Sequence, residues 1–203
     1  MLRRTYNNQK IDIKKMHRHF IIYKPWGYLS QFTYNLKRNK KLLGELHDFP
    51  DGTMAIGRLD EDSEGLLLLT TDGMMSEIVR SKKVEKEYYA QVDGLVTQLA
   101  IEQLQQGVEI GFNGTRYVTK PCKALILPAP PALPTRSKKI RDERHGPTSW
   151  ISITVTEGKF RQVRKMTSAV GLPTLRLVRV RVGNVQLDTL QPGRVQEVDS
   201  FAV

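Results

Sequence analysis

The stretch IGRLDEDSEGLLLLTTDG, residues 56–73, places four carboxylates within five residues, directly before four consecutive leucines. Like charges at this spacing repel one another, and a carboxylate beside a buried segment loses part of its hydration. The leucine run ends at an Asp-Gly turn, which predicts a strand that is covered on both faces. Asp60 follows a predicted strand over residues 52–60, and the loop that begins there can hold its carboxylate toward a cleft.

A simple polar turn is the alternative interpretation on local grounds. Asp62, Ser63 and Gly65 suit a turn, because short polar side chains bond to nearby backbone amides and glycine accepts unusual dihedral angles. Glu61 and Glu64 are expected to be solvated. The choice between a turn and a reactive site therefore depends on side chains that distant parts of the chain supply.

The composition indicates a folded, water-soluble protein with a basic surface. The chain has 203 residues, of which 39% are hydrophobic and 26% charged, and this length suits one large domain or two small subdomains. Its 32 lysines and arginines outnumber 21 acidic residues, for a net charge of +11. Such an excess is typical of proteins that bind a nucleic acid, and a basic protein without that partner is the alternative.

The single cysteine and the scattered histidines exclude several classes of protein. Cys122 cannot form an internal disulfide, which fits a reducing compartment, and no spacing of histidines and cysteine matches a metal site. The apolar runs are too short to span a membrane, and the first ten residues lack the apolar core of a secretory signal. We expect a cytoplasmic protein with no metal and no membrane partner.

The pattern of apolar residues predicts more strands than helices, without regular alternation. Strands are expected over residues 19–23, 52–60, 66–71, 86–93, 117–127, 149–158, 174–187 and 193–199. Helices are expected over residues 74–80, 98–106 and 160–170, with a short one within residues 36–49. In the clearest helix Thr97 is the N-cap, Leu99 and Leu104 share one face, and Gly107 follows the end. This mixture predicts an α+β fold with a largely antiparallel sheet.

Two segments are predicted to lie outside the regular elements. Residues 1–16 are polar and basic and predict a flexible tail before a folded part over residues 17–203. Residues 128–147, PAPPALPTRSKKIRDERHGP, are rich in proline and charge, which predicts a long exposed insertion. The basic side chains that make this insertion a candidate phosphate-binding arm are Arg136, Lys138, Lys139 and Arg141.

The segment GKFRQVRKM, residues 158–166, supplies Arg161, Arg164 and Lys165. Arg161 and Arg164, three residues apart, are expected to share a helix face. An arginine beside a partly buried carboxylate keeps it ionised and orients it through charge-assisted hydrogen bonds. Taken alone, a basic helix of this kind is more often a solvated or phosphate-binding face.

The segment KEYYA, residues 86–90, places two tyrosines in a predicted strand. A tyrosine in a cleft can stack on a nucleobase. The alternative is a pair of ordinary strand tyrosines, one of which packs inward.

Three motifs in this order resemble the RsuA-type RNA pseudouridine synthases. GRLDEDSEGLLLLTTDG resembles the signature of that family, KEYYAQV its Lys-x-Tyr strand, and EGKFRQVRKMTSAVGLPTLRLVRVRVG its third motif with the strand that follows. The resemblance covers most of residues 17–185. It implies a catalytic domain of two subdomains, with a mixed, largely antiparallel sheet, flanking helices, a central cleft and no cofactor. Relatives usually carry an S4-type RNA-binding domain, for which the first 16 residues leave no room.

The resemblance also assigns roles to individual residues. Asp60 corresponds to the catalytic aspartate, Tyr88 to the tyrosine that lies against the target uracil, and Arg164 to the arginine that pairs with the aspartate. Leu177 lines the pocket, and Arg58 supports the site from the same motif as Asp60. Further RNA contacts are expected from Lys86, Arg161 and Lys165, and from the arm residues Arg136, Lys138, Lys139 and Arg141.

The chemistry of uridine isomerisation explains why one reacting carboxylate suffices. The C1′–N1 bond breaks, the base turns, and C5 bonds to C1′. Uracil departs as a delocalised anion, so no second acid is needed, and the carboxylate either attacks the sugar or removes a sugar proton. With PTSW at residues 147–150 before the third motif and no extra domain, the resemblance implies large-subunit rRNA as the substrate, and we expect a monomeric enzyme. A small-subunit rRNA synthase, a non-catalytic RNA-binding assembly factor and a glycoside hydrolase are the alternatives.

Overall fold

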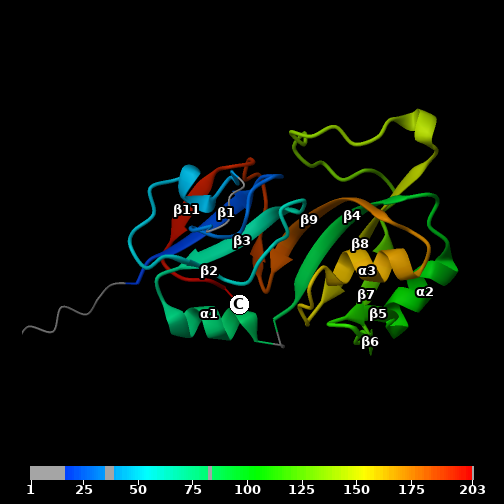
Figure 1. Ribbon diagram of the computed structural model, residues 1–203, viewed down its shortest axis with the longest axis horizontal. Helices are drawn as coiled ribbons and strands as arrows, with labels where there is room; N and C mark the ends of the chain where they lie inside the picture. The colour runs from blue at the N-terminus through cyan, green and yellow to red at the C-terminus, as the bar shows by residue number, and fades with distance from the viewer. Residues whose placement is uncertain (1–16, 35–38, 82–83, 203) are drawn as a thin grey trace, which may run out of the picture.

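A nine-stranded sheet runs through the described part of the chain, which in this computed structural model comprises residues 17–34, 39–81 and 84–202 (Figure 1). Its strands are β1 (His19–Lys24), β2 (Met54–Ala55), β3 (Glu64–Thr70), β4 (Lys86–Asp93), β7 (Lys123–Ile126), β8 (Thr148–Val155), β9 (Thr174–Val182), β10 (Val185–Gln186) and β11 (Val195–Val198). A separate hairpin consists of β5 (Glu109–Phe112) and β6 (Thr115–Val118). The helices are α1 (Gly73–Arg80), α2 (Gln98–Gln106) and α3 (Gln162–Ala169), with 3-10 helices at Leu43–Glu45 and Glu143–His145.

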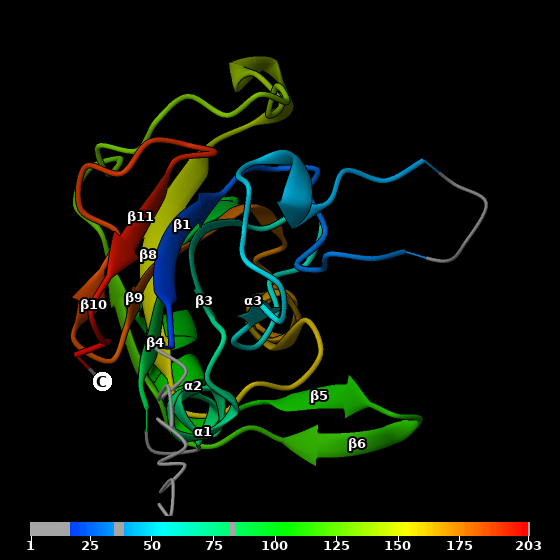
Figure 2. The ribbon, with the colours of Figure 1, turned by 90° about the vertical axis from the view of Figure 1, so that its left-hand side faces the viewer.

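The sheet is mixed but mostly antiparallel. Its strands follow the order β11-β1-β3-β9-β4-β8-β7, and β2 and β10 are added to β3 and β9. Each pairing in it is antiparallel except that of β3 with β9. The α+β class and the mixed sheet are therefore confirmed. Figure 2 shows α3 and the β5–β6 hairpin on the same side of this sheet.

The sheet has two halves, β11-β1-β3 and β9-β4-β8-β7, which meet at a short parallel contact between β3 and β9. Only Glu64 with Val178 and Gly65 with Arg179 are in register between β3 and β9. Beyond this contact, apolar side chains from both strands join Val79 of α1 in one core cluster. The acidic loop, residues 60–64, leads directly into this junction, so its position is set by both halves of the sheet.

The four leucines of β3 form the centre of the core, as their run predicts. Leu66 and Leu68 pack in the cluster with Val178, and Leu67 and Leu69 pack on the other face in a second cluster. All seven residues of β3 are buried. At roughly 2 kcal/mol for each fully buried leucine side chain, this strand contributes strongly to the hydrophobic stabilisation of both faces.

Gly65 lies at the closest approach of the two halves. Its φ is +101°, a conformation that glycine adopts freely and other residues rarely adopt. A Cβ at this position would come within 2.3 Å of the carbonyl oxygen of Arg179. The sequence pattern placed Gly65 in a turn, whereas the structure places it inside β3, where the parallel contact requires a residue without a side chain.

Helix α2 confirms the predicted cap but not the predicted apolar face. The hydroxyl of Thr97 accepts a hydrogen bond from the backbone N–H of Ala100 at 3.2 Å, and the helix ends before Gly107. Leu99, however, is 66% exposed, and the buried residues are Ala100, Ile101 and Leu104. Leu104 is thus buried as expected, but the prediction for Leu99 was wrong, because the packing of α2 against β7, rather than residue type, selects the buried stripe.

Two predicted strands are shorter than expected. Residues 117–127 form the separate strands β6 and β7, and Pro121 lies between them, where it has no N–H to donate to a ladder. Residues 52–60 contain only the two-residue β2, because the chain turns at Gly57 with a φ of +71°. The sequence pattern also missed β5, and it merged β9 and β10 into one strand over residues 174–187.

Residues 128–147 contain no strand or α-helix, only the 3-10 helix Glu143–His145, and they extend above β8 in Figure 1. This segment is called the arm below. The predicted tail, residues 1–16, lies outside the described residues. Within the described ranges, no helix is both long and apolar enough to cross a membrane, and no group of three His, Cys, Asp or Glu side chains forms a metal cluster.

Candidate active site

The acidic loop is anchored at its start by backbone and hydroxyl contacts. Ser30 Oγ donates to the carbonyl of Leu59 at 2.8 Å and accepts from its N–H at 3.0 Å. The N–H of Ser63 then donates to the carbonyl of Asp60 at 3.1 Å, which closes the loop as a turn. The expected turn is therefore present, but backbone groups rather than the Ser63 hydroxyl close it, and it fixes the backbone that carries Asp60.

The side chain of Asp60 lies at a small pocket together with three other residues that the sequence singled out. Arg58, Tyr88 and Leu177 line this pocket with it. Tyr88 extends from β4 next to a bulge in the pairing with β9, and Leu177 is a buried residue of β9. Residues that are up to 119 positions apart in the chain thus form a carboxylate, an aromatic wall and an aliphatic lining around one space.

Arg161 binds both carboxylates of the loop. Its guanidinium donates to Asp62 Oδ1 at 2.9 Å and Oδ2 at 2.8 Å, and it lies 3.5 Å from Asp60 Oδ2. Arg161 was expected to share a face of α3 with Arg164, but it does not. It is the N-cap residue of the helix and has a left-handed backbone with φ +53°. A non-glycine residue in this conformation is strained, and here it directs the guanidinium to the loop.

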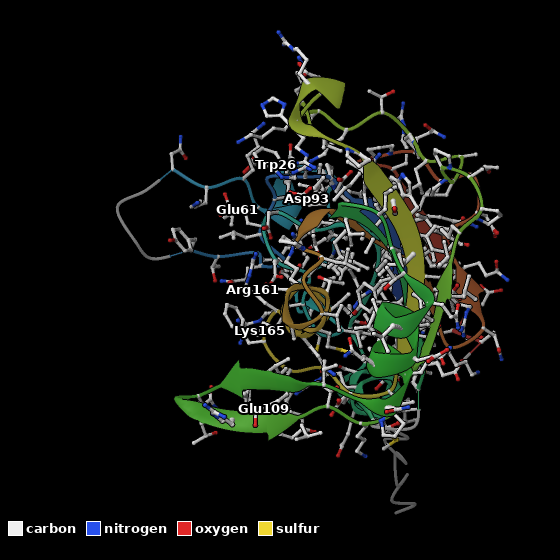
Figure 3. All side chains as sticks on the ribbon, turned by 90° about the vertical axis from the view of Figure 1, so that its right-hand side faces the viewer. Trp26, Glu61, Asp93, Glu109, Arg161 and Lys165 are labelled. Atoms are coloured by element: carbon white, nitrogen blue, oxygen red, sulfur yellow. The ribbon has the colours of Figure 1, made fainter. Side chains whose placement is uncertain are left out.

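Arg164 holds the backbone of the same loop. Its Nη2 donates to the carbonyl oxygen of Asp62 at 2.8 Å and to Ser63 Oγ at 3.2 Å, whereas its Nε lies 4.0 Å from Asp60 Oδ2. The structure therefore brings Arg164 and Asp60 together, but the short hydrogen bonds go to the residues after Asp60. Figure 3 shows Arg161 on the same side of the molecule as Glu61 of the loop.

The two aspartates have opposite pKa shifts. Burial raises the pKa of Asp60, the charge of Asp62 adds to this, and the charges of Arg161 and Arg164 oppose it. For Asp62 burial also favours the neutral form, but the hydrogen bonds from Arg161 and the charge of Arg164 hold its pKa below the ordinary value. Environments that separate two neighbouring carboxyl groups in this way are typical of sites that use them differently.

Glu64 is the clearest correction to the sequence-based expectation. It was predicted to be solvated, but it is 2% exposed, and Arg176 of β9 donates to its two carboxylate oxygens at 3.1 and 3.0 Å. The reason is the parallel junction, which buries the first residue of β3 against β9. Glu61 is partly exposed and pairs with Lys40 at 2.7 Å, in agreement with a peripheral place.

Lys24 is a charged residue that the sequence analysis missed. Its side chain is fully buried, and its Nζ donates to the carbonyls of Tyr28 at 2.7 Å and Pro25 at 3.0 Å. Burial lowers its pKa to about 8, against the charges of Glu64 and Asp60 that raise it. A lysine that ends the otherwise apolar strand HFIIYK was the available signal.

Nearby cations explain how the crowded carboxylates of the acidic loop are tolerated. Asp60, Asp62 and Glu64 each face at least one arginine, and Lys24 adds a buried charge from β1. Opposite charges at these distances outweigh the repulsion between the carboxylates. The acidic loop is thus one part of a compact ionic cluster that requires several elements of the fold.

A second, wider pocket adjoins the first at Tyr88 and Arg58. Its cationic side chains come from six different elements and loops: Arg58, Arg80, Lys86, Lys120, Lys159 and Arg179. The predicted Lys86 lies here, next to the base-stacking candidate Tyr88. Arg80, Lys120 and Lys159 were not singled out from the sequence, because nothing local marks a lysine or arginine as part of a shared groove.

The remaining residues that were predicted to contact RNA differ in their exposure and in the contacts that they make within the protein. Lys138 is exposed above the ring of Trp26, and Lys139 is 80% exposed. Lys165 donates to the carbonyl of Gly111 in β5 at 2.8 Å. In Figure 3, Trp26, Glu61, Arg161, Lys165 and Glu109 follow one another along one edge of the molecule, from the arm to the hairpin.

Two arm arginines are engaged within the protein itself. Arg141 forms an ion pair with Asp93 at the end of β4, and Arg136 is largely buried beside Glu64. A guanidinium that already has internal partners is a poor candidate for a phosphate contact, because binding would leave those partners unpaired. The arm as an RNA-binding element thus depends on Lys138 and Lys139.

Comparison with known families covers most of the chain. The family model described as RNA pseudouridylate synthase matches residues 18–169. Ribosomal large subunit pseudouridine synthase E of Vibrio parahaemolyticus is 40% identical over 195 residues, which span 95% of this chain and 78% of that protein. The protein of the same name from Xanthomonas axonopodis is 41% identical, over 85% of this chain and 89% of that protein. The one from Xanthomonas campestris is 40% identical, over 90% of this chain and 96% of that protein.

Solved structures agree with this match. A crystal structure of a pseudouridylate synthase superposes with a TM-score of 0.69 at 27% identity, over 90% of this chain and 70% of that chain. The structure of an H/ACA ribonucleoprotein bound to a substrate RNA containing 2′-deoxyuridine superposes with a TM-score of 0.54 at 17% identity, over 86% of this chain and 50% of that chain. This second likeness is one of fold.

Proposed function

We propose, from the premise that this chain belongs to the RNA pseudouridylate synthase family, that it isomerises a uridine of large-subunit rRNA with Asp60 as the reacting carboxylate. The single observation that carries the role of Asp60 is its place at a pocket with Tyr88 and Leu177, between two arginines. The names of the relatives support large-subunit rRNA as the substrate. We further propose that the enzyme acts in the cytoplasm as a monomer.

The reaction balances within the substrate. The bond between C1′ and N1 breaks, the uracil turns, and a bond from C5 to C1′ forms; C5 loses its proton and N1 gains one. Asp60 either attacks C1′ and is later displaced, or removes a sugar proton and returns it. In both routes its ionised carboxylate reacts, so the ion pairs that keep Asp60 charged despite burial are part of the mechanism.

The other pocket residues have roles that follow from their chemistry. Tyr88 stacks on the uracil, a contact worth about 1–3 kcal/mol, and Leu177 excludes water from the base while it is detached. Arg161 and Arg164 orient the loop. The target uridine must leave its stack to reach Asp60, because the carboxylate lies inside a pocket. The second, wider pocket, which adjoins the first at Tyr88 and is lined by cationic side chains, then binds the phosphates on either side of that nucleotide.

The pH dependence of the reaction follows from the environment of Asp60. Its raised pKa places the loss of activity on the acid side at a higher pH than for an ordinary aspartate, because only the ionised form reacts. Arg161→Gln moves this acid limb to still higher pH, since it removes a nearby positive charge and leaves Asp62 without its bidentate partner. The measurement is kcat/KM against pH. Arg18→Gln, which breaks an ion pair with Glu197 of β11, is the control; an unshifted limb in Arg161→Gln contradicts the role of Arg161.

The arm lysines are expected to contribute to RNA affinity. Lys138→Gln combined with Lys139→Gln weakens binding and reduces the slope of log K against log salt concentration by about 1–2, because two phosphate contacts are lost. The turnover rate at saturating RNA stays unchanged. Filter binding over a series of salt concentrations measures the slope, with Arg18→Gln again as the control. A slope equal to that of the wild type removes the arm from the RNA interface.

A map of pseudouridine on total rRNA tests the function itself. Cells that lack the gene are compared with cells that carry the wild-type chain. Loss of one large-subunit modification, restored by the wild-type chain, is the expected result. Loss of a small-subunit modification corrects the substrate, whereas an unchanged map favours a non-catalytic assembly factor.

A further inference from the structure

Glu64 faces a second arginine, which comes from the arm. Arg136 Nε lies 3.5 Å from Glu64 Oε1, and the side chain of Arg136 is only 10% exposed. Arg176 already donates two hydrogen bonds to the same carboxylate. A buried carboxylate therefore lies between one arginine from the central sheet and one from the irregular arm.

Backbone contacts fasten the arm to β9 at the same place. Arg176 Nη2 also donates to the carbonyl of Pro134 at 2.8 Å, and Arg136 Nη1 donates to the carbonyl of Leu175 at 3.1 Å. Each arginine thus binds the backbone of the segment that carries the other. This reciprocal pairing fixes residues 134–136 of the arm against the sheet, although the arm has no strand or α-helix of its own there.

The same arginine contacts the segment on the other side of the acidic loop. The guanidinium of Arg136 lies 5.3 Å from the centre of the Trp26 ring. The next residue, Gly27, donates its N–H to the carbonyl of Glu61 at 2.8 Å. Figure 3 shows Trp26 and Glu61 close to each other below the arm. Arg136 is therefore linked to the acidic loop at two positions, directly at Glu64 and through Trp26 and Gly27 at Glu61.

We propose that Arg136 is a positioning residue that holds the acidic loop in the geometry of the reaction, and not an RNA contact. The inference rests on the proposed role of Asp60, which directly precedes Glu61 in that loop. A displaced loop moves the Asp60 carboxylate relative to the sugar, and misplacement by about 1 Å can cost on the order of 100-fold in rate. The arm is thereby a structural part of the active site.

Burial makes Arg136 dependent on the charge of Glu64. Desolvation lowers the pKa of Arg136, and the charge of Glu64 opposes that effect. Removal of Glu64 leaves a buried guanidinium without a carboxylate, whereas removal of Arg136 leaves Glu64 paired with Arg176 alone. Arg136→Met and Glu64→Gln should therefore each destabilise the protein, and the double variant should lose less than the sum of the two.

The experiment separates positioning from RNA binding. Arg136→Met keeps the length of the side chain and removes its charge, Arg136→Lys restores the charge, and Lys138→Met removes an exposed cation above the same Trp26 ring as the matched control. In single-turnover assays at saturating RNA, Arg136→Met lowers the rate by about 10-fold or more, while its Kd for RNA changes by less than about 2-fold. Arg136→Lys recovers part of the rate. Lys138→Met weakens binding, and it lowers the rate at saturating RNA by less than Arg136→Met does.

Other outcomes contradict either the positioning role of Arg136 or its pairing with Glu64. If Arg136→Met weakens binding and flattens the salt dependence as Lys138→Met does, with an unchanged rate, Arg136 is an RNA contact. If neither rate nor Kd changes, Arg136 has no role in positioning. The unfolding midpoints of the two single variants and the double variant test the Arg136–Glu64 coupling without any activity. A wild-type protein that forms no pseudouridine rejects the proposed function, whereas strictly additive midpoints reject this pairing.

Discussion

Asp60→Asn is expected to abolish pseudouridine formation and to leave the fold intact. An amide neither attacks C1′ nor removes a proton from the sugar, so the single-turnover rate should fall by at least about 10³-fold. The surrounding contacts persist, because the short hydrogen bonds of Arg161 and Arg164 go to Asp62 and Ser63. The measurement is conversion of rRNA by the purified variant, together with its affinity for the same RNA, which should stay within about 2-fold of the wild type.

The stability of this variant gives an independent check. Because the folded state raises the pKa of Asp60, ionisation of Asp60 costs folding free energy, and this cost appears as the pH rises from the unfolded pKa through the folded one. Asn carries no charge, so the unfolding midpoint at neutral pH should equal or exceed that of the wild type.

Asp62→Asn is the matched comparison for Asp60→Asn. Its pKa is lowered in the folded state, so its contribution to stability is present at neutral pH and is lost as the pH falls through the folded pKa. The substitution should therefore lower the midpoint and retain measurable turnover. An active Asp60→Asn, or an Asp62→Asn as inactive as Asp60→Asn, contradicts the assignment of Asp60.

Gly65→Ala is expected to have the largest effect on stability of any small substitution in the sheet. Alanine at φ +101° is strained, and its Cβ would lie 2.3 and 2.8 Å from backbone atoms of Arg179, which cannot move without breaking the parallel contact. The free energy of unfolding should fall by about 3 kcal/mol or more. Denaturation in urea, followed by circular dichroism, measures this loss.

Gly73→Ala serves as the control for Gly65→Ala. Gly73 is the first residue of α1, and a Cβ there meets nothing within 4 Å. Alanine favours a helix over glycine, so the same experiment should show a gain of up to about 1 kcal/mol. Equal effects at the two positions would show that the close approach of β3 and β9 does not constrain Gly65.

The sequence alone predicted the elements whose signals are local. The leucine run of β3 and the Thr97 cap of α2 were found because burial on both faces and cap chemistry depend on neighbouring residues. The buried face of α2 and the division of residues 117–127 into β6 and β7 were not, because these features depend on packing and on where Pro121 interrupts a ladder.

In the candidate site, too, local signals were readable from the sequence and long-range contacts were not. The motifs in the sequence identified Asp60, Tyr88 and Leu177, and the structure places all three at one pocket. The sequence could not identify the buried charges, since the partner that decides whether Glu64 is solvated lies 112 positions away, at Arg176. Charged side chains carry no periodic signal of burial, because their burial depends on whether the fold supplies an opposite charge.

The sequence by itself thus determined which residues are candidates for the reaction and the buried strand that follows Asp60, because chemical type and apolar pattern are local properties. Only the tertiary structure decided how the acidic loop is held. Lys24, Arg136 and Arg176 come from three distant segments. The pairing of β1 with β3 places Lys24 opposite Gly65, whereas Arg136 and Arg176 reach Glu64 where β3 meets β9. The fold is therefore what converts a repulsive run of carboxylates into a stable ionic cluster around the candidate catalytic aspartate.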